Sequence, residues 1–189
     1  MSHYTALLDA NILYPAPMRD LLMQLAVTDL FKAKWTADIH REWIENLLKN
    51  QPHRLRENLE RTRDLMDCAV RDSLVTGYEP LIPALNLPDP DDRHVLAAAI
   101  VGRCDVIITQ NLKDFPSEVL APYGIEAQHP DAFLCNHLSL APGLFCSVVR
   151  KVRCRLKEPP FNAMDYLDTL TRLGLVATAA ELTAFIDLI

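Results

Sequence analysis

DVIIT, residues 105–109, is an apolar run of three residues between an aspartate and a threonine. Strands that are buried on both faces of a parallel sheet have this kind of composition. A second short run, His3–Leu8, ends directly before Asp9, and Ile125–Ala127 offers a third strand. Because these runs alternate with helical segments, the sequence predicts an α/β domain with a mostly parallel sheet.

The spacing of apolar residues predicts the helices of this domain. They are Met18–Leu30, Thr36–Leu48 with Thr36 as its N-cap, His53–Ser73, Asp91–Arg103 and a short helix after Pro116. After Pro130 the pattern changes, and helical segments follow one another without strands: Leu144–Leu156, Ala163–Leu173 and Ala177–Leu188. We therefore expect an α/β domain over residues 1–135 and a helical C-terminal extension over residues 136–189.

Length and charge limit the functions that this chain can have. Its 189 residues suit one domain with a small appendage, and its formal net charge is −6. An acidic chain is not a general binder of nucleic acid, because neutralising phosphates requires clustered Lys and Arg. A nucleic-acid function would therefore depend on a local site. The basic run RKVRCRLK (150–157) fits either a solvated helix face or a phosphate contact.

The cysteines and the N-terminus predict a cytoplasmic protein. The five cysteines are odd in number and form no CxxC pair, which favours free thiols in a reducing compartment. The sequence contains no apolar run near the roughly 20 residues that a membrane span needs. MSHYTALLDANIL (1–13) has no basic region followed by a long apolar run, so we expect neither a secretory signal nor a membrane partner.

Acidic and amide side chains follow the predicted strands. Asp9 comes directly after the first strand, and Asn111 and Asp114 come after DVIIT. In open parallel sheets, ligands bind at the edge formed by the carboxyl ends of the strands. LPDPDDRHVLAAAI (87–100) opens a helix with Asp89 and Asp92. Separate chain segments thus offer oxygen ligands at the same kind of edge.

The helix Thr36–Leu48 supplies a further acid. At 100° per residue, Glu42 lies beside the apolar side of this helix, whereas Glu45 lies nearly opposite it. Glu42 is therefore the glutamate that we expect to lean toward the sheet edge. The same construction places His94 away from the Asp92 face of its own helix, on the protein surface.

Carboxylates gathered in one place raise each other's pKa, and a divalent cation relieves the repulsion. Mg²⁺ binds a few carboxylates while keeping several waters, and Mn²⁺ accepts similar ligands. Such a centre can activate a water molecule and neutralise charge on a phosphodiester. The sequence has no HExxH, GxGxxG or GxxxxGK[ST] motif that would indicate a different chemistry.

Each candidate residue also has a purely structural interpretation. Asp89 can be an N-cap, Pro90 the first helical residue, and Asp92 an acid favoured by the helix dipole. Asn111 and Asp114 can be ordinary loop residues. The functional interpretation depends on the convergence of several segments.

Taken together, four blocks resemble the PIN-domain nucleases, and among them the toxin ribonucleases of VapC type. The blocks are LLDANIL (7–13), TADIHREW (36–43), LPDPDDRHVLAAAI (87–100) and DVIITQNLKDFP (105–116). They occur in the order of the family, and the resemblance covers about residues 4–135. It implies a PIN-like three-layer α/β/α fold.

The resemblance also implies a ligand set. Asp9, Glu42 and Asp92 would hold Mg²⁺, with Mn²⁺ able to substitute, and Asp89 would be a neighbour in the third block. The implied catalytic residues are Asp9, Glu42, Asp92, Asn111 and Asp114, of which Asp9, Asp92, Glu42 and Asn111 would bind the metal.

The fourth block departs from the pattern of the family. The family usually has an aspartate where this chain has Asn111, so either Asp114 or the amide of Asn111 completes the site. This departure leaves the number of bound metals open. Thr109 matches the family's hydroxyl and would orient the ligands through hydrogen bonds.

The function that the resemblance implies is endonucleolytic cleavage of RNA at exposed single-stranded positions, in tRNA or ribosomal RNA. The implied partners are a small antitoxin and a second copy of the chain. The alternative is a catalytically weak or inactive PIN-like module that binds RNA or protein. Other α/β folds fit less well: a phosphatase of haloacid-dehalogenase type needs an aspartate where Asn11 stands, and the acidic pair and lysine of a receiver domain are not well placed.

Overall fold

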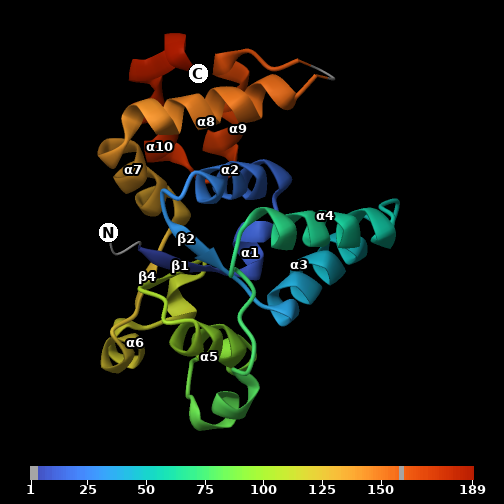
Figure 1. Ribbon diagram of the computed structural model, residues 1–189, viewed down its shortest axis with the longest axis vertical. Coiled ribbons are helices and arrows are strands. Elements are labelled where there is room, and N and C mark those ends of the chain that lie inside the picture. Colours follow the sequence, from blue (N-terminus) through green and yellow to red (C-terminus); the bar gives the residue numbers. More distant parts are fainter. Residues whose placement is uncertain (1–3, 158–159) are drawn as a thin grey trace.

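The computed structural model describes residues 4–157 and 160–189 (Figure 1). Within these residues, four parallel strands form one sheet in the order β2-β1-β3-β4. The strands are β1 (Thr5–Leu8), β2 (Lys32–Lys34), β3 (Val106–Ile108) and β4 (Glu126–Gln128). His3, the predicted start of the first strand, lies outside the described residues.

Helices form most of the remaining chain. The α-helices are α1 (Ala10–Leu13), α2 (Ala16–Val27), α3 (Ala37–Asn50), α4 (Arg56–Ala69), α5 (Arg93–Val101), α6 (Ser117–Leu120), α7 (Pro130–Leu140), α8 (Pro142–Arg155), α9 (Ala163–Arg172) and α10 (Val176–Leu182). Short 3-10 helices lie at η1 (Glu79–Ala84), η2 (Pro90–Asp92), η3 (Leu112–Asp114), η4 (Ala121–Tyr123) and η5 (Thr183–Leu188). In the part of the chain that the structure describes, no helix has the length and apolar character needed to cross a membrane.

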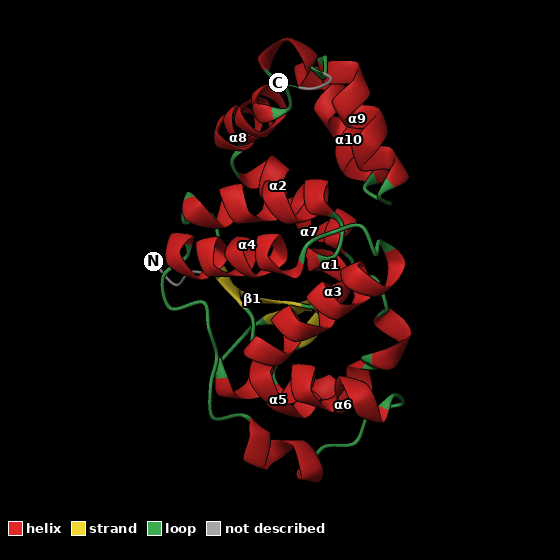
Figure 2. Ribbon diagram, turned by 90° about the vertical axis from the view of Figure 1, so that its right-hand side faces the viewer, coloured by secondary structure: helices red, strands yellow, loops and turns green. Residues whose placement is uncertain are grey.

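The helices cover both faces of the sheet. α2 lies on one face, and α5 and α6 lie on the other (Figure 1), so the predicted three-layer α/β/α architecture is confirmed. Figure 2 shows α8 and α9 stacked beyond α2, on the side away from the sheet. α8 packs directly on α2, and α10 packs on α7 and α9. The predicted helical C-terminal extension therefore rests on the α/β layers.

The composition of each strand matches its place in the sheet. β1 and β3 are central, and their apolar residues are buried. β2 and β4 are edge strands with the sequences KAK and EAQ. β2 was not predicted from the sequence, because one alanine between two lysines does not form an apolar run. Charged residues are nevertheless common on edge strands, where they prevent pairing with another chain.

The largest difference between the predicted and the observed helices is α7, which was not predicted from the sequence. It begins directly after β4, with His129 as N-cap and Pro130 as its first residue. The side chains of Phe133 and Leu134 are buried. Because α7 continues to Leu140, a boundary at residue 135 falls inside a helix. The division into an α/β domain over residues 1–135 and an extension over residues 136–189 remains a prediction.

A buried polar network fixes α3 against α4 and the end of β2. Trp35 Nε1 donates to Asp67 Oδ1 (2.7 Å), and His40 Nε2 lies 3.1 Å from the same oxygen. Trp43 Nε1 donates to His40 Nδ1 (2.9 Å), so the ring proton of a neutral His40 sits on Nε2 and is donated to Asp67. Arg19 lies over the Trp43 ring, 4.7 Å from its centroid. The network holds the helix that carries Glu42.

We expect Asp67→Ala to destabilise the protein, because the buried side chains of Trp35 and His40 both lose their half-buried hydrogen-bond acceptor. The loss should be about 2 kcal/mol or more in the free energy of unfolding, measured by urea denaturation. The matched control is Asp64→Ala on the same helix. Among the described residues its carboxylate pairs with Arg63 alone, at the surface, so the change should stay within about 0.5 kcal/mol. Equal losses in the two variants would contradict this account of the network.

Candidate metal centre

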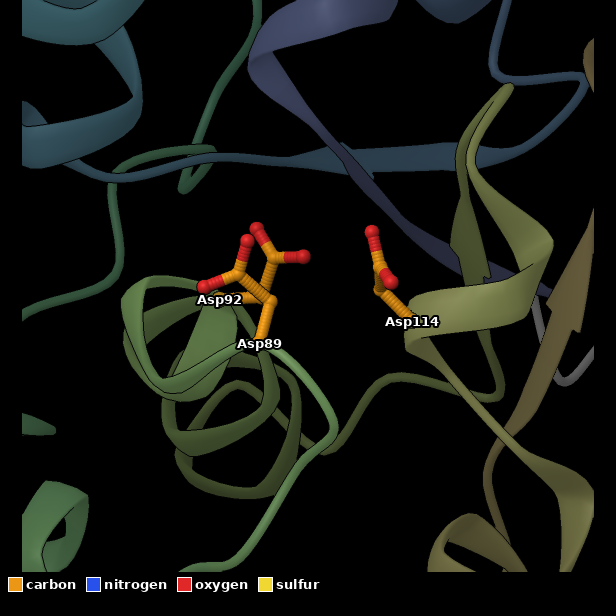
Figure 3. A group of neighbouring side chains, drawn as sticks. All are labelled: Asp89, Asp92 and Asp114. Atoms are coloured by element: carbon orange, nitrogen blue, oxygen red, sulfur yellow. The ribbon is translucent and has the colours of Figure 1, made fainter.

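Carboxylates gather where β1 and β3 end. Asp9 follows β1, Asp114 ends η3 just after β3, and Asp89 and Asp92 stand before α5. Figure 3 shows Asp89 and Asp92 at the start of α5, with Asp114 projecting from η3 opposite them. Among the described residues, one oxygen from each of these three carboxylates lies within 4.8 Å of the others. The structure thus brings the third and fourth sequence blocks together.

The predicted capping role of Asp89 in PDPDD (88–92) is confirmed, and it leaves the Asp92 carboxylate available for a ligand. Asp89 is the N-cap of η2, and its Oδ1 accepts from the backbone N–H of Asp91 (2.9 Å). Pro90 is the first residue of that turn. In the described structure, Asp92 forms no capping hydrogen bond at the start of α5. Capping and ligand binding are therefore compatible in this segment.

Asp9 is held in one orientation by three hydrogen bonds. Its side chain is buried, with the residue 4% exposed. Oδ1 accepts from the backbone N–H of Ala10 (2.6 Å), and Oδ2 accepts from Asn11 Nδ2 (2.5 Å) and Thr109 Oγ1 (2.7 Å). A carboxylate offers about four lone-pair positions, so one position on Oδ1 remains for a further ligand.

Burial raises the pKa of Asp9, and the charge of Glu42 raises it further. The hydrogen bond from Thr109 opposes both effects, because it stabilises the charged form. Thr109 is itself fully buried and accepts from Asn11 Nδ2 (2.9 Å) and from the backbone N–H of Asn111 (3.0 Å). Thr109 therefore lies behind Asp9, in the place that an orienting hydroxyl requires.

In the fourth block, Asn111 contacts Asp114 directly. The side-chain amide of Asn111 donates to Asp114 Oδ2. The Asn111 nitrogen therefore points toward Asp114. Of these two residues, Asp114 belongs to the acidic group of Asp89, Asp92 and Asp114. Sequence alone left the choice between these two residues open. In the structure the two side chains are hydrogen-bonded to each other, with the amide as donor and the carboxylate as acceptor.

Glu42 lies at the exposed side of the site. Its side chain is 45% exposed, and its Oε2 is 3.6 Å from His94 Nε2. Its charge contributes to the raised pKa values of both Asp9 and Asp92. Glu45 pairs instead with Arg56 (2.8 Å), away from these acids. Glu42 is thus the nearer glutamate, although it is outside the compact group of three.

The prediction that His94 is a surface residue was wrong. Its side chain is only 17% exposed and lies beside Glu42, and its Nδ1 is buried without a hydrogen-bond partner among the described residues. The error arose because a helical wheel describes one helix alone. It does not show that Glu42 of α3 lies beside His94 and helps to cover it.

The group is electrostatically unfavourable without a cation. The pKa of Asp92 is raised to about 7, first by burial and then by the charges of Asp9, Asp89, Asp114 and Glu42. All the converging donors are carboxylate oxygens, which are the ligands preferred by hard divalent cations. The donor set therefore fits Mg²⁺ or Mn²⁺.

Two participants were not assigned a role from sequence. Asn11 bridges Asp9 and Thr109, and its Oδ1 accepts from the backbone N–H of Gln110 (3.1 Å). Gln110 in turn reaches toward the C-terminal extension. These contacts join residues about one hundred positions apart. Such long-range contacts cannot be predicted from local patterns in the sequence.

Comparisons with known proteins agree with the sequence blocks. A family model described as PIN domain matches residues 5–113, and one described as VapC50 C-terminal domain matches residues 130–184. A protein of Mycobacterium tuberculosis (strain ATCC 25618 / H37Rv), named "Putative ribonuclease VapC50", is 45% identical over 94 residues. The match covers 50% of this chain and 55% of that protein, so it spans about half of each. No solved structure matches the chain.

The raised pKa of Asp92 predicts a pH dependence of stability in metal-free protein. The folded state binds a proton that the unfolded state has released between pH 4 and 7, so stability falls as pH rises through this window. Asp92→Asn removes the titration. In EDTA, this variant should therefore exceed the wild type in Tm by about 3 °C at pH 8, after allowing for solvent screening, and by much less at pH 5.

The control for this measurement is Asp91→Asn, which changes the adjacent, exposed carboxylate. This variant should show no comparable gain in Tm over the wild type at pH 8. A Tm offset of Asp92→Asn that is the same at pH 5 and pH 8 would contradict the assignment.

Proposed function

The chain belongs to the PIN-domain family, and from this premise we propose that it is a metal-dependent endoribonuclease, the toxin of a VapC-type toxin–antitoxin pair. One observation carries the proposal: Asp89, Asp92 and Asp114 converge at the carboxyl edge of the parallel sheet, close to the buried Asp9. The name of the mycobacterial relative, a ribonuclease, supports RNA as the substrate.

The residues that would hold the cation are Asp89, Asp92 and Asp114, together with the remaining position on Asp9 Oδ1. Mg²⁺ is the proposed cofactor, and Mn²⁺ would substitute because it accepts the same oxygen ligands. The chemistry that a divalent cation supplies at such a site is polarisation of a phosphodiester and activation of water. The single free position on Asp9 favours binding through one oxygen.

The protein's own contribution is to fix these groups before the substrate arrives. Asn11 and Thr109 prevent the Asp9 carboxylate from rotating, and Asn111 does the same for Asp114. Ligands that are held by such neighbours need no reorganisation when charge develops on a phosphate. Glu42 lies on the exposed side, where it can complete the ligand set or accept a proton from water.

The RNA would be recognised at the site and not by the overall charge of the chain. Lys113 is exposed and adjacent to Asp114, and Arg93 is adjacent to Asp92. Their proposed role is to contact phosphate groups next to the acids. As the substrate we propose structured RNA with exposed single-stranded positions, such as tRNA or ribosomal RNA. A small antitoxin that covers this site is the proposed partner, which membership in a toxin family would require.

The proposed function is tested by incubating purified protein with total tRNA and with a single-stranded RNA, in Mg²⁺, Mn²⁺ or EDTA. We expect cleavage that requires a metal. Asp9→Asn and Asp92→Asn should each lower its rate by at least about 100-fold, since even outer-shell partners of metal ligands are worth 10- to 100-fold.

The matched controls are Asp91→Asn, beside Asp92, and Glu45→Gln, one helical turn from Glu42. Both side chains are exposed, and both variants should retain wild-type cleavage. Cleavage in EDTA, or cleavage that survives both Asp9→Asn and Asp92→Asn, would refute the assignment.

The hydrogen bond from Asn111 to Asp114 also supports a second candidate function, a catalytically weak or inactive module that binds RNA or protein. An amide stands where the family usually has a carboxylate, so the site has one negative charge fewer. Asn111→Asp adds that charge. We expect it to tighten Mn²⁺ binding about tenfold in calorimetric titration, because affinity increases with the number of charged ligands.

The control is Asn58→Asp, which adds the same charge on the exposed side of α4 and should leave Mn²⁺ binding unchanged. A wild type that binds Mn²⁺ and cleaves RNA supports the nuclease. A wild type without Mn²⁺ binding, joined with a variant Asn111→Asp that gains it, supports the inactive module.

A further inference from the structure

The C-terminal extension reaches the candidate metal centre through one turn, residues 173–175, between α9 and α10. The backbone carbonyl of Leu173 accepts from Gln110 Nε2 (3.3 Å). Gln110 lies between Thr109 and Asn111, both of which contact the acids of the site. The extension therefore touches the loop that organises the metal ligands.

From Gln110, a continuous series of hydrogen bonds leads to Asp9. The backbone N–H of Gln110 donates to Asn11 Oδ1 (3.1 Å). Asn11 Nδ2 then donates to Asp9 Oδ2 (2.5 Å) and to Thr109 Oγ1 (2.9 Å). Since Asn11 follows β1 and Gln110 follows β3, these bonds tie two neighbouring strand ends together.

Contacts from α7 hold the start of α10, which directly follows this turn. Asp131, in the first turn of α7, accepts from the backbone N–H groups of Ala177 and Thr178 (both 2.8 Å) and from Thr178 Oγ1 (2.7 Å). Leu175 is fully buried. Gly174 has a φ of +86°, a conformation that a residue with a Cβ rarely adopts. The turn that carries the Leu173 carbonyl is therefore followed directly by a segment that α7 holds in place.

We propose that the C-terminal extension is a positioning element of the metal centre, and that Gln110 is the positioning residue through which it acts. Leu173 follows α9 as its C-cap, and carbonyls at helix C-termini lack partners within the helix and carry partial negative charge. The Gln110 amide satisfies one of them. We call the hydrogen bond from Gln110 Nε2 to the Leu173 carbonyl the tether. The tether keeps loop 109–111 in one conformation, so that Asn11 and Thr109 remain hydrogen-bonded to Asp9.

This inference rests on the proposed function for its consequence in metal binding, but the tether itself exists in metal-free protein. It assigns the extension a role that a separate docking appendage would not have. An appendage would leave loop 109–111 unaffected, whereas a positioning element changes that loop when the contact is removed.

The test is Gln110→Met, which keeps the length of the side chain and the backbone N–H but removes the donor. Gln110 is exposed, so Tm should change by no more than about 3 °C. In metal-free protein, amide hydrogen exchange at position 110 should become about tenfold faster. The Mn²⁺ dissociation constant should rise about tenfold, as for other outer-shell partners.

A second variant tests the same contact by a change within the C-terminal extension. Asp131→Ala releases the start of α10 and with it the turn, and should weaken Mn²⁺ binding by a similar factor. The two changes act on one path, so the double variant should bind Mn²⁺ no more weakly than either single variant. The matched control is Asp165→Ala, which breaks the capping box at the other end of α9 and should leave Mn²⁺ binding unchanged.

Failure of this inference can be distinguished from failure of the proposed function. If the wild type binds Mn²⁺ and Gln110→Met alters neither affinity nor exchange at position 110, the tether is refuted and the nuclease is not. If the wild type binds no Mn²⁺, the nuclease is refuted. Exchange at position 110 then decides the tether alone: faster exchange in Gln110→Met supports it, and unchanged exchange overturns it.

Discussion

The backbone N–H of Asp9 donates to the carbonyl of Ile108 (3.1 Å), where β1 and β3 end side by side. This pairing joins segments about one hundred residues apart, and the contacts between the two strand ends depend on it. It brings Thr109 to Asp9 and Gln110 to Asn11, and it directs η3 toward the start of α5. A parallel sheet places all such strand ends on one edge, so a single register determines the positions of the acids.

Much of this arrangement could be predicted from sequence, because it depends on local patterns. Apolar runs identified β1 and β3, and turn chemistry identified Asp89 as an N-cap. Other features depend on distances between loops, which no local pattern encodes. The choice of Asp114 for the acidic group is one example, and the bridging by Asn11 is another. His94 shows a third limit, since a helical wheel of α5 alone cannot indicate that Glu42 of α3 lies beside it.

The rest of the fold compensates for the repulsion between the carboxylates of the site. Like charges on Asp92 and its neighbours oppose folding in the absence of a cation, as the raised pKa of Asp92 records. Large apolar side chains and the buried network around His40 offset this cost elsewhere. A ligand that binds only the folded state then adds stability by mass action. The same repulsion that weakens the metal-free protein is what would make cation binding favourable.

The junction between β4 and α7 has a consequence for the behaviour of the whole chain. Domains usually meet at exposed, flexible linkers, and such linkers are where proteases cut. Here only His129 separates Gln128 from Pro130, and α8 covers α2 directly. The α/β layers and the extension should therefore melt in one cooperative transition. Cutting the chain at residue 135 would interrupt a helix and expose the apolar face of α2 to water.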